Sequence, residues 1–278
     1  MTWVLVAVAA SGPPELKRAR ELYQQTRYEE ALHIVEAIDK RSPAAWELRG
    51  KIRYQQGEFK RACEALEKAV AMEPGNSGHH LWLGRAYGRR AETSSFLTAP
   101  GHAVKARRSF EKAVELDRRN LEAMSDLLEY YLKAPGFLGG GIEKAEAVAA
   151  KIGAVDAAEH QNALARTAEK RGDYSSAERN LRRAVELEPK RTGRWIDMAK
   201  FLARRGRLEE SEAAFWQAEQ AAPADPRLLY ERAGVYVRAK RNLDTARELL
   251  ARYLNSPLTP DDPPRREAER LLKQATRG

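Results

Sequence analysis

The segment WELRGKIRYQQGEFKRACEALEKAVAMEP, from Trp46 to Pro74, decides the fold. Its apolar residues follow a helical spacing on both sides of a turn that contains Gly57. Glycine tolerates positive φ and is therefore suited to end the first helix, while the final proline stops the second one. The segment predicts a helix, a turn and a second helix.

The same pattern recurs along the chain at intervals of about 34 residues, which is typical of a helical repeat. An alanine preceded by a turn and followed by an apolar helix marks each unit, and Ser211 replaces one of these alanines. A second, mostly small residue lies one helix earlier, so two helices are expected to approach closely there. The alanines are Ala31, Ala62, Ala106, Ala145, Ala177 and Ala246, and the earlier residues are Ala19, Gly50, Gly84, Leu128, Ala165, Ala199 and Ala233.

These positions resemble the tetratricopeptide repeat family, whose unit carries a Trp, a Leu-Gly pair, a Tyr, two small residues and a closing Pro. The resemblance covers residues 12–260 and implies a right-handed superhelix in which the first helix of each pair lines the concave face. The third and fourth units depart from the family pattern by insertions. The matches are Trp46, Gly50, Tyr54, Gly57, Phe59, Ala62, Ala69 and Pro74 in the second unit, and Trp195, Ala199, Gly206, Phe215, Ala218 and Pro223 in the sixth.

We therefore expect an all-α solenoid of about seven tetratricopeptide-like repeats with a C-terminal capping helix. Residues 261–278 are expected to form the cap and tail, because RREAERLLKQA has the polar outer side that a terminal repeat requires. The prolines between Ser256 and Pro264 separate this helix from the preceding one. The expected units are 12–42, 43–76, 77–120, 121–157, 158–191, 192–225 and 226–260.

Residues 1–11 form an apolar N-terminal tail that is too short to span a bilayer. Ala7-Val8-Ala9 matches the small-residue pattern of a signal-peptidase site, although no basic leader precedes it. Two interpretations stay open, a signal-peptide remnant of an exported, periplasmic protein and a frayed tail of a cytoplasmic one. The segment YYLKAPGFLGGGIEKA, from Tyr130 to Ala145, resembles an element of some exported bacterial repeat proteins and slightly favours export.

Basic residues outnumber acidic ones, 49 to 40, and the net charge of +9 favours acidic partners. The first helices concentrate basic residues at two positions one turn apart, which lie on the same face. In the first two units the second position holds Gln24 and Gln55. Trp82 precedes one of the basic residues and either faces a ligand or is covered by the next unit. The predicted ligand-binding groove consists of Arg20, Lys51, Arg85, Arg89, Lys133, Arg166, Lys170, Lys200, Arg204 and Arg238.

Such a groove suits an acidic extended peptide, a C-terminal carboxylate or a phosphorylated segment, because Arg and Lys donate charge-assisted hydrogen bonds. We expect a scaffold that binds another, acidic protein. Two alternatives stay open: the same residues neutralise the phosphates of a nucleic acid, or they are a solvated helix face. The carboxylate clamp of chaperone-binding family members is not expected, because Arg20 and Lys51 stand where it requires Asn.

Two insertions, SSFLTAPG and APGFLGGG, lie in consecutive turns between paired helices. They bring Phe96, Leu97, Phe137 and Leu138 to one edge of the predicted solenoid. These residues either form an apolar rim patch that marks a partner site or bury one another. Burial is the expected outcome, because exposed apolar patches are uncommon on monomers.

We expect no enzyme, cofactor, metal site or transmembrane segment. The single cysteine, Cys63, excludes an internal disulfide or a cysteine-rich zinc module. The five histidines lack the spacing of metal ligands. The run Gly139-Gly140-Gly141 lacks the strand and the lysine of a phosphate-binding loop.

Overall fold

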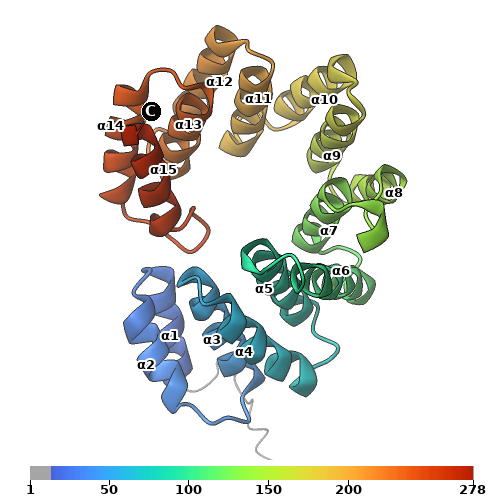
Figure 1. Ribbon diagram of the computed structural model, residues 1–278, viewed down its shortest axis with the longest axis vertical. Coiled ribbons are helices and arrows are strands. Elements are labelled where there is room, and N and C mark those ends of the chain that lie inside the picture. Colours follow the sequence, from blue (N-terminus) through green and yellow to red (C-terminus); the bar gives the residue numbers. More distant parts are fainter. Residues whose placement is uncertain (1–13, 278) are drawn as a thin grey trace, which may run out of the picture.

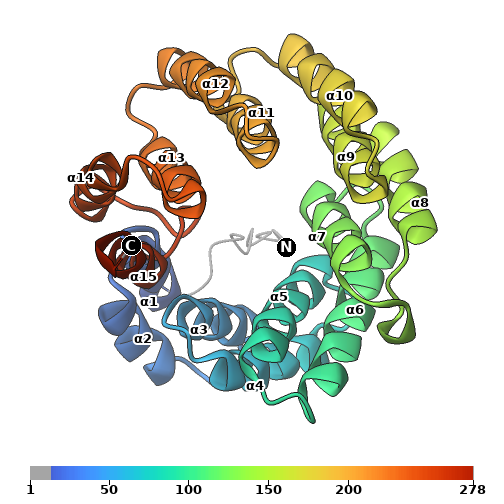
Figure 2. The ribbon, with the colours of Figure 1, turned by 45° about the horizontal axis from the view of Figure 1, so that its top comes forward.

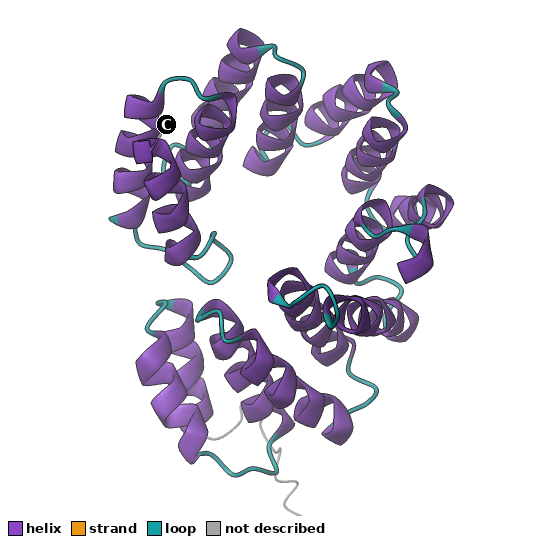
Figure 3. Ribbon diagram, in the orientation of Figure 1, coloured by secondary structure: helices purple, strands orange, loops and turns teal. Residues whose placement is uncertain are grey.

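The computed structural model describes residues 14–277, and every regular element in that range is a helix (Figure 3). None of these helices is long and apolar enough to cross a membrane. The proposed signal-peptide remnant lies outside the described residues. Seven helix pairs are followed by a single helix, α15 (Arg265–Arg277).

The pairs follow one another without interruption, and a short 3-10 helix, η1 (Gly136–Leu138), lies inside the fourth turn. They are α1 (Pro14–Gln24) with α2 (Tyr28–Ala37), α3 (Pro43–Gln55) with α4 (Phe59–Met72), α5 (Ser77–Thr93) with α6 (Ala99–Leu116), α7 (Leu121–Lys133) with α8 (Ile142–Gly153), α9 (Ala157–Arg171) with α10 (Tyr174–Leu187), α11 (Thr192–Arg204) with α12 (Leu208–Ala221), and α13 (Pro226–Ala239) with α14 (Leu243–Leu254).

Each pair packs on the next, and the stack curves into a nearly closed ring (Figures 1 and 2). From α3 to α14 the first helix of each pair faces the centre of the ring and the second forms the outer wall. After almost one full turn, the start of α15 comes close to the N-terminal part of the ring, where Arg266 contacts Tyr54 of α3 and Glu267 pairs with Arg89 of α5. The expected α-solenoid and its capping helix are therefore confirmed.

The turns between paired helices use the expected glycines. The φ angles of Gly57, Gly172 and Gly206 are 82°, 80° and 77°, a region that side chains with a Cβ rarely adopt. Elsewhere a polar side chain stabilises the start of the helix. Asp156 and Asp173, for example, accept hydrogen bonds from the first-turn backbone N–H groups of Glu159 and Ser176.

Small residues allow the paired helices to approach closely. A Cβ at Gly84 would lie 2.5 Å from the ring of Phe110 on α6, and one at Gly50 would lie 2.4 Å from Leu66 on α4. Ser211, which replaces the recurrent alanine, is fully buried and donates a hydrogen bond of 2.8 Å to the carbonyl oxygen of Ala199. These contacts confirm that two helices meet where the sequence places its small residues.

The cap closes the last apolar face. Ala268 and Ala275 of α15 are fully buried in a cluster with Leu250 and Tyr253 of α14. Leu258, in the loop that leads to α15, belongs to the same cluster. The cap is therefore anchored to the seventh pair by apolar contacts.

The contact at Gly84 predicts opposite effects for two substitutions in the same helix. Gly84→Ala places a methyl group against Phe110 and is expected to lower the free energy of unfolding by about 1–3 kcal/mol. Gly88→Ala meets no atom within 4 Å and is expected to be neutral or to stabilise α5 by up to about 1 kcal/mol. Urea unfolding followed by circular dichroism measures both. Equal changes in the free energy of unfolding would show that the close approach of Gly84 to Phe110 does not constrain the packing of α5 on α6.

Candidate ligand-binding groove

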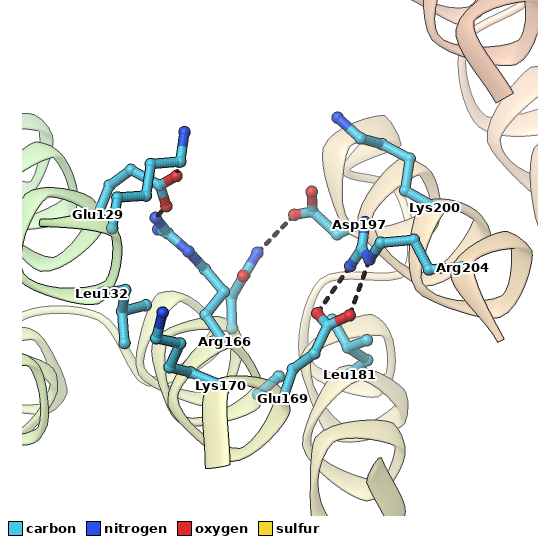
Figure 4. Close-up of a pocket in the computed structure, with 12 residues that line it drawn as sticks. Glu129, Leu132, Arg166, Glu169, Lys170, Leu181, Asp197, Lys200 and Arg204 are labelled. Carbon is cyan, nitrogen blue, oxygen red and sulfur yellow. Dashed lines mark hydrogen bonds and ion pairs between the residues drawn. The ribbon is translucent and has the colours of Figure 1, made fainter. Parts of the chain in front are cut away.

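Five of the predicted groove residues come together in one cavity of about 630 Å3 on the inner side of α7, α9 and α11 (Figure 4). We call this cavity the central groove. Because its walls are first helices of three consecutive pairs, it faces the centre of the ring. The predicted residues that line it are Lys133, Arg166, Lys170, Lys200 and Arg204.

Carboxylates that the sequence analysis did not assign to the groove pair with most of these cations. Arg204 donates two hydrogen bonds of 2.7 Å to Glu169, one to each carboxylate oxygen. Glu129 is paired with Arg166 and, at 2.6 Å, with Lys133. Lys200 is 2.9 Å from Glu231 on α13. The groove is therefore a network of ion pairs between neighbouring repeats.

Lys170 differs from the other four cations. Its side chain is exposed, and no carboxylate of the described residues lies within ion-pair distance of its ammonium group. In Figure 4 it points upward from α9 on the side of Leu132, below Arg166 and away from Arg204. An ammonium group without a carboxylate partner among the described residues therefore lines the central groove.

Asn162 and Asp197 form the floor of the central groove. The Asn162 side-chain amide donates a hydrogen bond of 2.5 Å to Asp197 across the α9–α11 contact. Burial raises the pKa of the Asp197 carboxyl group, and the hydrogen bond from Asn162 and the charge of Lys200 oppose the increase. The negative charge of Asp197 is therefore costly at this position.

Three further predicted residues line a second cavity of about 960 Å3, where α1, α3 and α5 face the start of α15. We call it the closure cavity. Arg85 binds Asp126 at 2.6 Å and Glu122 at 2.9 Å, and Lys51 binds Glu47 at 2.7 Å. Arg89 binds Glu92 at 2.5 Å and Glu267 of α15 at 2.9 Å.

Trp82 also lines the closure cavity and therefore lies on the inner face. Its ring makes an edge contact with Tyr54, at 5.6 Å between centroids, and the charged groups of Lys51 and Arg85 each lie 5.0 Å from its centroid. Of the two placements expected for Trp82, the structure has the one that faces the groove.

The last two predicted groove residues, Arg20 and Arg238, are exposed but line neither cavity. Arg238 lies along its own helix, with its guanidinium group near Gly234. The predicted groove is thus divided into two parts, and its end residues belong to neither part.

The expected mutual burial of the turn residues is wrong for three of the four. Phe96, Leu97 and Phe137 are 84%, 77% and 82% exposed. Only Leu138 is half-buried, in a cavity with Ala103 and Phe110, and its carbonyl oxygen accepts a hydrogen bond of 2.9 Å from the Tyr130 hydroxyl. The two extended turns therefore leave three of their four apolar side chains exposed. Their role as a partner site stays a prediction.

Cys63 is fully buried in α4, and burial raises the pKa of its thiol to about 11. A thiol with this pKa is protonated at neutral pH and is a poor nucleophile. No group of three or more His, Cys, Asp or Glu residues between positions 14 and 277 is arranged to hold a metal ion.

The raised pKa of Asp197 predicts a pH-dependent stability difference. The folded state holds the Asp197 proton more tightly than the unfolded state, so stability is lost as the pH rises from the ordinary aspartate pKa through the raised pKa of Asp197. Asp197→Asn removes the charge and keeps an oxygen that accepts the bond from Asn162. It is expected to raise the melting temperature at pH 7, and the difference from the parent protein should disappear near about pH 3.

The control for this prediction is Asp173→Asn. Hydrogen bonds from Ser176 lower the pKa of the exposed Asp173, so the loss of its charge is expected to destabilise at pH 7, with the opposite sign. A lower melting temperature for Asp197→Asn at pH 7 would contradict the analysis of the groove floor.

Sequence profiles of the tetratricopeptide repeat match residues 16–77, 48–90 and 168–228. Between these matches lie the two insertions that distinguish the third and fourth units. A comparison with curated protein sequences found no significant match.

Solved structures of tetratricopeptide repeat proteins share this fold. One from Parabacteroides merdae has a TM-score of 0.61 at 14% identity, over 94% of this chain and 97% of that one. A thermophilic one from Thermus thermophilus has a TM-score of 0.52 at 20% identity, over 80% and 97%. The repeated helix pairs, the profile matches and these structures together show that the chain belongs to the tetratricopeptide repeat family.

Proposed function

We propose that the chain is a non-enzymatic scaffold whose central groove binds an acidic, extended segment of a partner protein. Tetratricopeptide repeat proteins in general bind other proteins and do not catalyse reactions. The observation that carries the finer proposal is the Lys170 ammonium group, which has no carboxylate partner among the described residues and lines the same cavity as Arg166 and Arg204.

A ligand carboxylate would first meet Lys170, which requires no existing ion pair to break. A second carboxylate, further along an extended peptide, would compete with Glu169 for Arg204 or with Glu129 for Arg166. Replacing Glu169 or Glu129 by a ligand carboxylate costs less free energy than leaving an arginine without a partner, because each guanidinium group keeps an anionic partner. The floor residues Asn162 and Asp197 offer polar atoms to the peptide backbone between these carboxylates.

The alternation of charges in the groove favours a peptide over a nucleic acid. Three carboxylates, Glu129, Glu169 and Asp197, lie among the five cations of the central groove. A nucleic acid presents a negative charge at every nucleotide and would meet these carboxylates with the wrong sign. A peptide carries its carboxylates at separate positions and can avoid them.

The proposal predicts that removing two cations of the groove weakens binding of an acidic peptide. The probe is a fluorescein-labelled decapeptide of Glu and Asp, titrated by fluorescence anisotropy at low salt. The double variant Lys170→Gln/Arg204→Gln is expected to bind it at least about tenfold more weakly, because each charge-assisted hydrogen bond contributes about 1.5–3 kcal/mol.

The matched control is Arg179→Gln/Arg183→Gln, which removes the same charge from exposed positions of the outer helix α10. It is expected to keep nearly the parent affinity. If both double variants lost the same amount of affinity for the peptide, the net charge of the protein would explain the effect and the central groove would not. Tighter binding of single-stranded RNA than of the peptide, with a steep dependence on salt, would favour the nucleic-acid alternative instead.

A further inference from the structure

The start of the cap contacts residues more than two hundred positions earlier in the chain. The side-chain amide of Gln55, at the end of α3, donates a hydrogen bond of 2.8 Å to the carbonyl oxygen of Pro260. In Figure 1 the loop before α15 points across the ring toward the N-terminal helices. We call residues 259–267 the clasp segment.

The clasp segment also makes a charged contact with α5 and a contact with the turn after α3. Glu267 binds Arg89 at 2.9 Å. The guanidinium group of Arg266 lies 5.1 Å from the centroid of the Phe59 ring and donates a hydrogen bond of 3.4 Å to the carbonyl oxygen of Tyr54. A Cβ at Gly57 would lie 1.8 Å from this guanidinium group, so the glycine of this turn leaves the room that Arg266 occupies.

The shape of the clasp segment is fixed within the seventh pair and the cap. The Asp262 carboxylate accepts hydrogen bonds of 2.8 Å and 2.9 Å from the backbone N–H and the hydroxyl of Thr259. The Tyr253 hydroxyl donates a hydrogen bond to the carbonyl oxygen of Pro263. Pro260 is buried, whereas Asp261 is exposed. The clasp segment therefore consists of a turn at residues 259–262, two prolines and the first helical turn of α15, and it meets α3 and α5 in this shape.

Gln55 and Arg89, which bind the clasp segment, stand at the second of the two groove positions that lie one turn apart on each first helix. Gln24, Gln55 and Arg89 are equivalent to Lys133, Lys170 and Arg204 in later repeats, and all three line the closure cavity. Gln55 binds a backbone carbonyl oxygen and Arg89 binds a carboxylate, as a groove would bind an acidic peptide.

Gln55 also retains unused hydrogen-bonding capacity. Its side chain is 6% exposed, and its Oε1 atom has no hydrogen-bond partner among the described residues. A buried amide that is half satisfied is costly, and a bound peptide with a backbone N–H group would satisfy it. The clasp segment therefore uses only part of the recognition capacity of this surface.

We propose that the side of the closure cavity formed by α1, α3 and α5 is a second peptide-binding site, which the clasp segment covers in cis until a partner displaces it. The partner would present the same chemistry, a proline-containing turn with a free backbone carbonyl group, followed by a carboxylate. The proposal concerns another part of the inner face than the central groove. It rests on the proposed function only for the premise that the second groove position contacts ligands.

The first measurement is the distance between the two ends of the ring. Spin labels at Lys60→Cys and Lys273→Cys, both exposed, are placed in a Cys63→Ala background and measured by electron paramagnetic resonance. Glu267→Arg sets two cations against each other at Arg89 and is expected to broaden and lengthen the distance distribution. Glu269→Arg makes the same charge change at an exposed position of α15 and is expected to leave the distribution narrow.

The second measurement is binding of a labelled synthetic peptide that copies Ser256–Arg270. The Glu267→Arg protein is expected to bind this peptide about tenfold more tightly than the parent protein, because the competing cis segment is released. Adding Gln55→Ala or Arg89→Gln to that variant is expected to abolish the gain. Circular dichroism checks that each variant remains helical.

Two results would overturn the proposal. One is an unchanged distance distribution together with equal peptide affinity for Glu267→Arg and Glu269→Arg. The other is an opened ring that does not bind the peptide, since the contact would then be a structural closure only. Lys170→Gln/Arg204→Gln alters the central groove and is expected to leave the distance distribution and the affinity for this peptide unchanged. The test of the closure cavity is therefore independent of the test of the proposed function.

Discussion

The close contact between the two helices of each pair is the constraint on which the rest of the structure depends. Glycine at positions 50 and 84 brings the backbones of α3 and α5 against Leu66 and Phe110 of their partner helices. This approach buries one side of each first helix and leaves the opposite side free. Because the pairs stack in order, the free sides face the centre of the ring, and the side chains on them become neighbours.

Contacts between residues 35 positions apart, one more than the length of these repeats, then link consecutive first helices on that inner face. Arg194 binds Glu159 at 2.6 Å, Asp197 accepts a hydrogen bond from Asn162, and Arg204 binds Glu169. Each contact joins the first helices of two consecutive repeats. The cations of the central groove other than Lys170 are therefore held in place before a ligand arrives, and a ligand must exchange partners with them. Such a groove gains selectivity at some cost in affinity.

The repeat pattern and the turn glycines predict the helix pairs and the side of each pair that faces inward, because both depend on local geometry. The partners of the groove cations were missed. The shared spacing of 35 residues from Glu159 to Arg194 and from Glu169 to Arg204 was the available signal, since it sets an acidic residue one position before the repeat equivalent of a basic one. The prediction that Phe96 and Phe137 are buried was wrong. It used the general rarity of exposed apolar patches, which does not determine the conformation of a particular turn.

The contact of Gln55 with Pro260 could not be predicted, because it depends on the curvature that all seven pairs accumulate. A small change in the angle between neighbouring pairs would be multiplied around the ring and would separate its ends. The same curvature divides the inner face into the central groove and the closure cavity. Local sequence thus determines which residues face inward, and the summed geometry determines which of them share a cavity.

The claim that ligands bind to the inner face is tested most directly by hydrogen–deuterium exchange of the parent protein with and without a saturating acidic peptide. The structure predicts slower exchange in α7, α9 and α11 and no change in the outer helices α8, α10 and α12. Protection of the outer helices, with unchanged exchange in the inner ones, would contradict it.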